Sequence, residues 1–132
     1  MLVAVGGLLV SHTLIAGNVA GQVLQGGAVL CALWVRVTFG RRSFHMAANP
    51  TVGGLVTTGP YRYVRHPIYV AVLLLVWAGV ATHATRRSFT LAALATAAVV
   101  VRIRAEEELL VIRYPAYAAY AARTKRLIPG VL

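Results

Sequence analysis

Acidic residues are scarce in this 132-residue chain, which has three Asp and Glu residues against thirteen Lys and Arg residues. Charged residues make up only 12% of the sequence, whereas roughly a quarter is usual for a soluble domain. Hydrophobic residues make up 59%, and the mean hydropathy is +0.75. This composition argues against an ordinary soluble domain and predicts an integral membrane protein whose surface is largely covered by lipid.

Cys31 is the only cysteine in the chain. A single cysteine excludes an intrachain disulfide and a metal-thiolate cluster. The histidines have no metal-ligand spacing, so we expect no metal site. The basic residues form no continuous basic face, so we expect no nucleic-acid partner. The apolar start of the chain lacks a positively charged leader and a cleavage site, so we expect its first segment to stay in the membrane.

The apolar residues are concentrated in four stretches, each near or slightly below the ~20 residues that cross a bilayer. These stretches are residues 2–16, 19–39, 67–83 and 88–103. We therefore expect an all-α integral membrane protein with a single domain, residues 1–132, and about four transmembrane helices. A cytoplasmic loop at 40–66 and a cytoplasmic tail at 104–132 complete it.

Local signals refine this topology. A short turn separates the last two stretches and predicts an antiparallel helical hairpin. Gly17 and Asn18 favour a turn between the first two stretches over a close helix contact. Gln22 and Gln25 lie on one face of the second stretch, where their amides are expected to bond to another helix. Pro115 interrupts the helical pattern of the tail, which predicts two short interfacial helices.

The basic residues orient the chain, since most of them fall in 36–65 and in 102–126. Segments rich in Lys and Arg stay on the cytoplasmic side and contact anionic lipid. We expect an active site that faces the cytoplasm from a bacterial inner membrane.

A dense polar segment, GPYRYVRHPIY at residues 59–69, precedes the third stretch. Pro67 suits the first position of a helix, so His66 falls at or next to the N-cap. A helix start attracts an anionic group. The simpler interpretation is that His66 caps the helix while Arg62 and Arg65 contact lipid phosphates.

All three acidic residues are consecutive, at 106–108, within RIRAEEELL near the end of the fourth stretch. Arg102 and Glu106 are four residues apart and share one helical face, and a solvated ion pair would explain them. Beside the membrane surface, however, anionic lipid would repel acidic side chains. Their position there favours a functional site over a simple ion pair. The hairpin brings them back to Pro67, so we predict one pocket that carries both charges, with tyrosines for a ring or a sulfonium.

Four segments together resemble the isoprenylcysteine carboxyl methyltransferase family, whose relatives include phospholipid N-methyltransferases. They are LVTTGPYRYVRHPIYVA, RIRAEEELL, YPAYAAY and RLIPG. The resemblance covers about residues 51–132. It implies a membrane enzyme that transfers methyl from S-adenosylmethionine to a lipophilic acceptor. Gly53 and Gly54 depart from the family's His-Thr pair, and the YPAY segment is one residue shorter than the family's motif.

The resemblance also implies roles for individual residues. Arg102 would bind a carboxylate of cofactor or substrate, and Glu106 would hold the amino group of the cofactor or an adjacent polar group. Three successive glutamates also allow a register with Arg104 and either Glu107 or Glu108, but we prefer Arg102 with Glu106 and Glu107. The residues implied in cofactor binding are Leu55, Val56, Tyr61, Arg65, His66, Pro67, Tyr69, Glu106 and Glu107.

The methyl acceptor stays open between several classes. A carboxylate is already ionised at neutral pH and needs an arginine to orient it, whereas an amine must first lose a proton. No dedicated base is evident, which favours a carboxylate. The alternatives are a phospholipid or other lipid N-methyltransferase, a non-catalytic membrane subunit, and a nicotinamide-dependent enzyme without the usual glycine-rich fingerprint. Membrane lipids and a lipophilic substrate are the expected partners.

Overall fold

The computed structural model describes residues 3, 6–7, 12, 14–39 and 55–128. Its regular elements are all helical over these residues, which confirms the predicted helical class. They are α2 (Val19–Phe39), the 3-10 turn η2 (Gly59–Arg62), α3 (Pro67–Thr82), α4 (Arg86–Arg113) and α5 (Tyr117–Arg123). The predicted first span at 2–16 lies mostly outside the described residues, as does the part of the predicted loop at 40–54.

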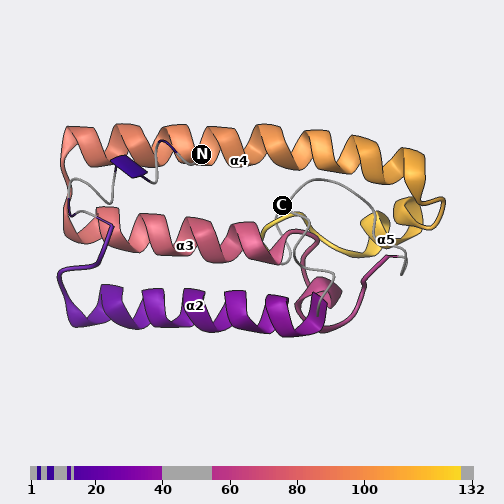
Figure 1. The fold of residues 1–132 in the computed structure, drawn as a ribbon, viewed down its shortest axis with the longest axis horizontal. Coiled ribbons are helices and arrows are strands. Elements are labelled where there is room, and N and C mark those ends of the chain that lie inside the picture. The colour runs from indigo at the N-terminus through magenta and orange to yellow at the C-terminus, as the bar shows by residue number, and fades with distance from the viewer. Residues whose placement is uncertain (1–2, 4–5, 8–11, 13, 40–54, 129–132) are drawn as a thin grey trace.

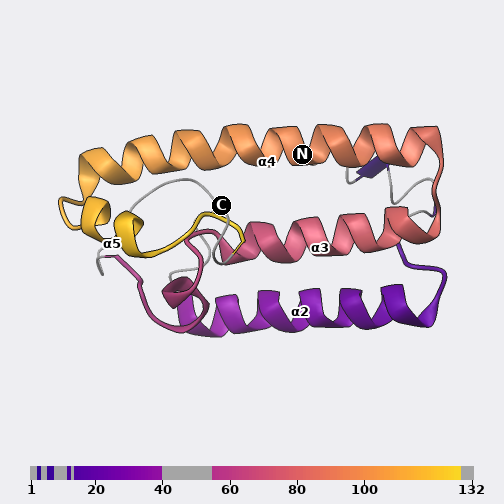
Figure 2. The same cartoon turned by 180° about the vertical axis from the view of Figure 1, so that it is seen from behind.

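The three long helices lie side by side in one layer with α3 in the middle, antiparallel to both neighbours (Figures 1 and 2). α3 has no charged residue, as expected for a helix covered on two sides. α4 turns a row of small and apolar side chains inward, with Ala92, Ala95, Val99 and Ile103 at helical spacing and all buried. The packed core therefore runs along the seam between α3 and α4.

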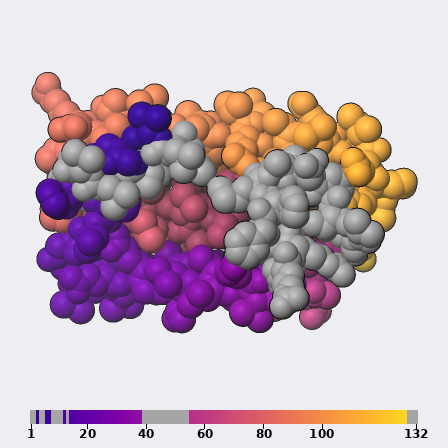
Figure 3. Space-filling model, viewed as in Figure 1, coloured from indigo at the N-terminus to yellow at the C-terminus, as the bar shows by residue number. Residues whose placement is uncertain are grey.

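The outer surface of this layer is apolar. α2 and α4 are long and apolar enough to cross a membrane, while α3 is apolar but has 16 residues. α2 leaves many large hydrophobic side chains exposed, including Leu30, Leu33, Trp34 and Val37, and it forms one edge of the molecule opposite α4 (Figure 3). Such a surface suits lipid, and membrane location stays a prediction.

The connection between α3 and α4 is the predicted helical hairpin. Thr85 is the N-cap of α4, and its side chain accepts a hydrogen bond from the Ser88 backbone N–H at 3.1 Å. The Ser88 hydroxyl in turn accepts from the Thr85 N–H at 3.0 Å, so two backbone donors at the helix start are satisfied.

The fourth helix is longer than the apolar stretch at 88–103 that was predicted to span the membrane. α4 begins at Arg86 and continues to Arg113, well beyond residue 103. The charged residues after 101 end the apolar stretch, but they are good helix formers, and no proline or glycine intervenes before Pro115. The tail therefore has one short helix, α5, and not the two that were predicted.

The start of α2 confirms the predicted turn and the predicted role of the Gln25 amide, whereas Gln22 Nε2 donates to the Ala16 carbonyl just before its own helix and to no other helix among the described residues. Asn18 Oδ1 accepts a hydrogen bond from the Gly21 N–H at 2.8 Å. Gln25 Nε2 donates to the Leu14 carbonyl at 2.6 Å and to the Leu75 carbonyl in α3 at 3.0 Å. One amide thus links the segment before α2 to the middle helix.

Gly59 fixes the position of η2 against the end of α2. Its φ of +58° is costly for other residues, and a Cβ built on it would lie 2.5 Å from Thr38 Oγ1. η2 therefore approaches α2 through a position that glycine alone fits without displacement.

We expect Gly59→Ala to lower the stability by about 1–3 kcal/mol, because the substitution adds both backbone strain and a clash with Thr38. Gly26→Ala is the matched control, since a Cβ there meets nothing within 4 Å and alanine favours a helix interior. Thermal unfolding of detergent-purified protein measures both. Equal melting temperatures for the two variants would contradict this account of the η2 contact.

Candidate functional site

Segments distant in the sequence meet at one end of the helical layer. The start of α3, the second half of α4 and α5 lie together there (Figures 1 and 2). Arg65 Nε donates to Glu107 Oε1 at 2.8 Å, and Tyr69 Oη donates to Glu106 Oε1 at 2.6 Å. The polar segment and the glutamates thus converge as the hairpin argument predicted. We call Arg65, His66, Tyr69, Arg102, Glu106, Glu107 and Arg126 the polar cluster.

His66 is the N-cap residue of α3, with Pro67 at the first helical position, as predicted. Its side chain does not cap that helix. Instead, its Nε2 lies 3.3 Å from Glu107 Oε1 and its Nδ1 lies 3.8 Å from Glu106 Oε2. Burial lowers the pKa of His66 and outweighs the opposite effect of the two glutamates, so the ring is neutral at neutral pH.

Glu106 lies at the rim of the polar cluster. Its Oε1 accepts hydrogen bonds from Tyr69 and, at 2.9 Å, from Arg102 Nε. The Arg102 side chain is 39% exposed and that of Glu106 is 20% exposed. This pair of opposite charges can therefore be reached from outside.

Glu107 is more deeply buried and is held by two arginines. Besides Arg65, its partner is Arg126, whose Nε donates to Glu107 Oε2 at 2.8 Å. The Arg65 Nη1 also donates to the carbonyls of Ala121 and Thr124. One carboxylate thereby joins α4, the start of α3 and the chain after α5.

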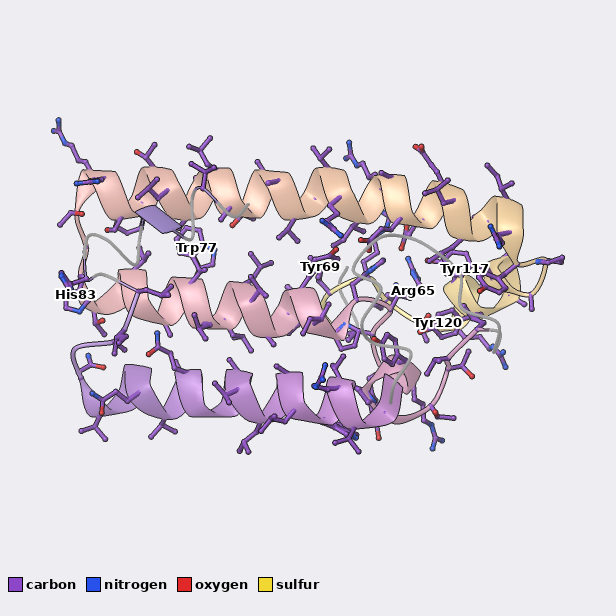
Figure 4. All side chains as sticks on the ribbon, in the orientation of Figure 1. Arg65, Tyr69, Trp77, His83, Tyr117 and Tyr120 are labelled. Atoms are coloured by element: carbon purple, nitrogen blue, oxygen red, sulfur yellow. The ribbon has the colours of Figure 1, made fainter. Side chains whose placement is uncertain are left out.

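The tyrosines of the tail complete this end of the molecule. Figure 4 shows Tyr117 and Tyr120 on the same side of the molecule as Arg65, with Tyr69 closer to the middle and His83 at the opposite end. Tyr120 Oη donates to the Tyr61 carbonyl at 2.7 Å. Tyr117 is buried, and its hydroxyl has no hydrogen-bond partner among the residues that the structure describes. Burial, with smaller effects of Tyr120 and Glu106, raises the pKa of Tyr61 to about 12.

The remaining predicted site residues take different places. Leu55 and Val56 are half-buried ahead of η2 and bring no polar side chain. Arg104 and Glu108, which belong to the other register, are exposed. The register with Arg102, Glu106 and Glu107 is the one whose side chains the fold brings to the polar cluster.

Arg126 is the member of the polar cluster to which the sequence analysis assigned no role in the site. It belongs to the RLIPG segment, so a signal was present in the motif. What the motif did not contain was the long-range packing that sets Arg126 against Glu107.

Apolar helices in one layer with a charged cluster at one end define a helical protein that sets a polar site beside a large apolar surface. The chain belongs to the phospholipid methyltransferase family, which it matches over residues 16–116. The predicted membrane methyltransferase family is thereby confirmed in its broad form, while the isoprenylcysteine subtype stays a prediction.

Two curated relatives are similar to most of this chain. The nickel-cobalt-cadmium resistance protein NccN of Alcaligenes xylosoxydans xylosoxydans is 36% identical over 107 residues. The cobalt-zinc-cadmium resistance protein CzcN of Cupriavidus metallidurans is 35% identical over 104 residues. Each comparison covers 78% of this chain and 43% of the relative, so the chain spans less than half the length of either protein. No solved structure matches the chain.

The lowered pKa of His66 predicts a pH dependence of stability. The unfolded chain takes up the proton more readily than the folded chain does, so the contribution of His66 is complete above its ordinary pKa of about 6.5. This contribution is lost as the pH falls from there toward the folded-state pKa, with a slope no steeper than about 1.4 kcal/mol per pH unit.

Thermal unfolding between pH 8 and pH 5.5 measures this effect, and His66→Gln should flatten the curve because glutamine keeps a polar side chain that does not titrate. A variant whose curve parallels that of the wild type would show that another group is responsible.

Proposed function

We propose that this chain is an S-adenosylmethionine-dependent membrane methyltransferase that acts on a lipophilic acceptor. The observation that supports it most is the group formed by Tyr69, Arg102 and Glu106, which lies beside His66 in a member of the phospholipid methyltransferase family. The helix start and the glutamate pair share one end of the molecule, as one site requires.

A position in the bacterial inner membrane is part of this proposal. α2 and α4 are long enough to cross a bilayer, and α3 between them is uncharged. The excess of Lys and Arg near the polar cluster favours the cytoplasmic side for that end. S-adenosylmethionine, made in the cytoplasm, would then reach the site directly.

The residues at the rim suit the amino-acid end of S-adenosylmethionine, which carries a carboxylate and an ammonium group. Arg102 and Glu106 offer the two complementary charges, and both are partly exposed. The buried Tyr117 hydroxyl, without a partner among the described residues, is a further group that a ligand can satisfy. When bound, the cofactor supplies an electrophilic methyl group on a sulfonium.

The chain's own residues would bind and orient. We assign Arg102 to a carboxylate and Glu106 to an ammonium group, while Tyr69 holds the Glu106 side chain in place. Methyl transfer is an in-line displacement, so alignment in a water-poor place is the main contribution of the protein. The apolar side chains around the start of α3 would exclude water.

A carboxylate acceptor, such as an isoprenylcysteine-like molecule, is the acceptor class we favour. Against the opposite effect of burial, Arg65 and Arg126 lower the pKa of Glu107, which makes it a weak base. Glu106 is engaged by Tyr69 and Arg102. A carboxylate acceptor is already ionised at neutral pH, so its methylation does not require a base.

The family description favours a second candidate, N-methylation of a phospholipid or another lipid amine. His66, neutral and buried beside the glutamates, would then be the group available to take the proton. Methyl transfer to a prenylated cysteine carboxylate compared with transfer to phosphatidylethanolamine vesicles separates the two candidates.

The names of the relatives concern metal resistance. The described residues contain no group of three or more His, Cys, Asp or Glu side chains that could hold a metal ion. We therefore base the proposal on the family and on the polar cluster, and we propose that the shared region supplies these proteins with the same methyltransferase scaffold.

The binding test is calorimetric titration of the detergent-purified chain with S-adenosylmethionine, S-adenosylhomocysteine and NADPH. We expect the first two to bind and NADPH to show no heat of binding. If none of the three binds, the chain is a non-catalytic subunit and the proposed activity is wrong.

We expect Arg102→Ala to reduce methyl transfer by about 100-fold or more, because it removes the cation that orients a carboxylate. Arg104→Ala is the matched control, since Arg104 lies on the same helix but is exposed. Initial rates with radiolabelled methyl donor measure both. Near-normal methylation by Arg102→Ala would remove Arg102 from the mechanism, and a loss confined to Arg104→Ala would establish the other register.

A further inference from the structure

We propose that Glu107 is a positioning residue and does not contact the cofactor. Together with Arg65 and Arg126, it holds the C-terminal segment, residues 117–128, across the start of α3. This arrangement closes the site around Glu106. We call residues 117–128 the tail segment. The proposal rests on the proposed function. It gives different roles to Glu106 and Glu107, whereas the resemblance implies that both bind the cofactor.

The two glutamates differ in how their oxygens are used. Glu107 accepts from Arg65 on Oε1 and from Arg126 on Oε2, and the residue is 9% exposed. Among the residues that the structure describes, Glu106 accepts hydrogen bonds from Tyr69 and Arg102, both on Oε1. Its Oε2 lies 3.8 Å from His66 Nδ1, beyond hydrogen-bonding distance. Glu106 therefore keeps capacity for a ligand that Glu107 has used within the protein.

Backbone hydrogen bonds attach the tail segment to the residues before α3. The Arg65 N–H donates to the Lys125 carbonyl at 2.7 Å, and the His66 N–H donates to the Arg126 carbonyl at 3.1 Å. Val64 and Lys125 form a parallel bridge at the same place. α5 has seven residues, too few for a stable isolated helix, so its order depends on this attachment.

The attachment also places the tail tyrosines. Tyr117 and Tyr120 are buried at this end of the molecule, and Tyr120 is bonded to the Tyr61 carbonyl of η2. Release of the tail segment would remove both rings from the site and expose the start of α3. Docking of the tail segment and binding of a ligand that contacts it must then favour each other to the same extent.

The amides of Arg65 and His66 report on this docking directly, because their acceptors belong to the tail segment. Hydrogen exchange followed by mass spectrometry, on the full chain in detergent or nanodiscs, measures peptides that contain them. We expect saturating S-adenosylhomocysteine to slow exchange at these amides by about threefold or more.

Arg126→Gln is the test variant, because the Arg126 side chain is 51% exposed and its loss leaves the buried Arg65 paired with Glu107. We expect about threefold faster exchange at Arg65 and His66 without ligand, a KM for S-adenosylmethionine raised several-fold, and kcat changed much less. Arg126→Lys should restore most of the wild-type behaviour. Glu107→Gln is less useful, since an unpaired buried Arg65 can prevent folding.

Arg123→Gln is the matched control, since it removes one positive charge from the same segment, and Arg123 Nε bonds to Ala119 within its own helix. Exchange and KM equal to those of the wild type are expected for it. If Arg126→Gln and Arg123→Gln behave alike, or if bound S-adenosylhomocysteine leaves the Arg65 and His66 amides unchanged, the positioning role is wrong although the chain binds its cofactor. If the wild type does not bind S-adenosylhomocysteine, the proposed function is wrong. Even in that case, faster exchange in Arg126→Gln than in Arg123→Gln would support docking of the tail segment by Glu107.

Discussion

The paired burial of Glu107 is the constraint on which this end of the molecule depends. A carboxylate taken out of water is costly unless charged donors surround it, and Arg65 and Arg126 supply them here, with the neutral His66 ring 3.3 Å away. Glu107 belongs to α4, whereas its donors come from other parts of the chain, the residues before α3 and the tail segment. The charge can therefore be buried only when α4, the start of α3 and the tail segment are all in place.

The same constraint explains why α4 is long and why adjacent glutamates can differ in role. The helix has to continue past its apolar part to bring residues 106 and 107 level with the start of α3. Successive residues of an α-helix point about 100° apart, so Glu106 and Glu107 face different partners although they are neighbours in sequence. One lies toward Tyr69 and Arg102 at the rim, and the other lies toward Arg65 and Arg126.

Local chemistry made much of this arrangement predictable from the sequence. Pro67 and the residue before it predicted the start of α3, and the short turn predicted the hairpin that brings Glu106 back to His66. Hydropathy did not show how far α4 extends, because a helix ends where its backbone hydrogen bonds end and not where its apolar side chains do. The i,i+4 spacing predicted the pair of Arg102 and Glu106, but the partners of Glu107 could not be predicted, since Arg126 reaches Glu107 only through the fold of the tail.

The central claim is that one end of an apolar helical layer binds the methyl donor through Arg102 and Glu106 while Glu107 stays paired within the protein. An experimental structure of the chain with S-adenosylhomocysteine tests it most directly. The account predicts the amino-acid end of the ligand at Arg102 and Glu106, with Glu107 still bonded to Arg65 and Arg126. A ligand whose ammonium group lies on Glu107, or which binds at the end that carries His83, would contradict it.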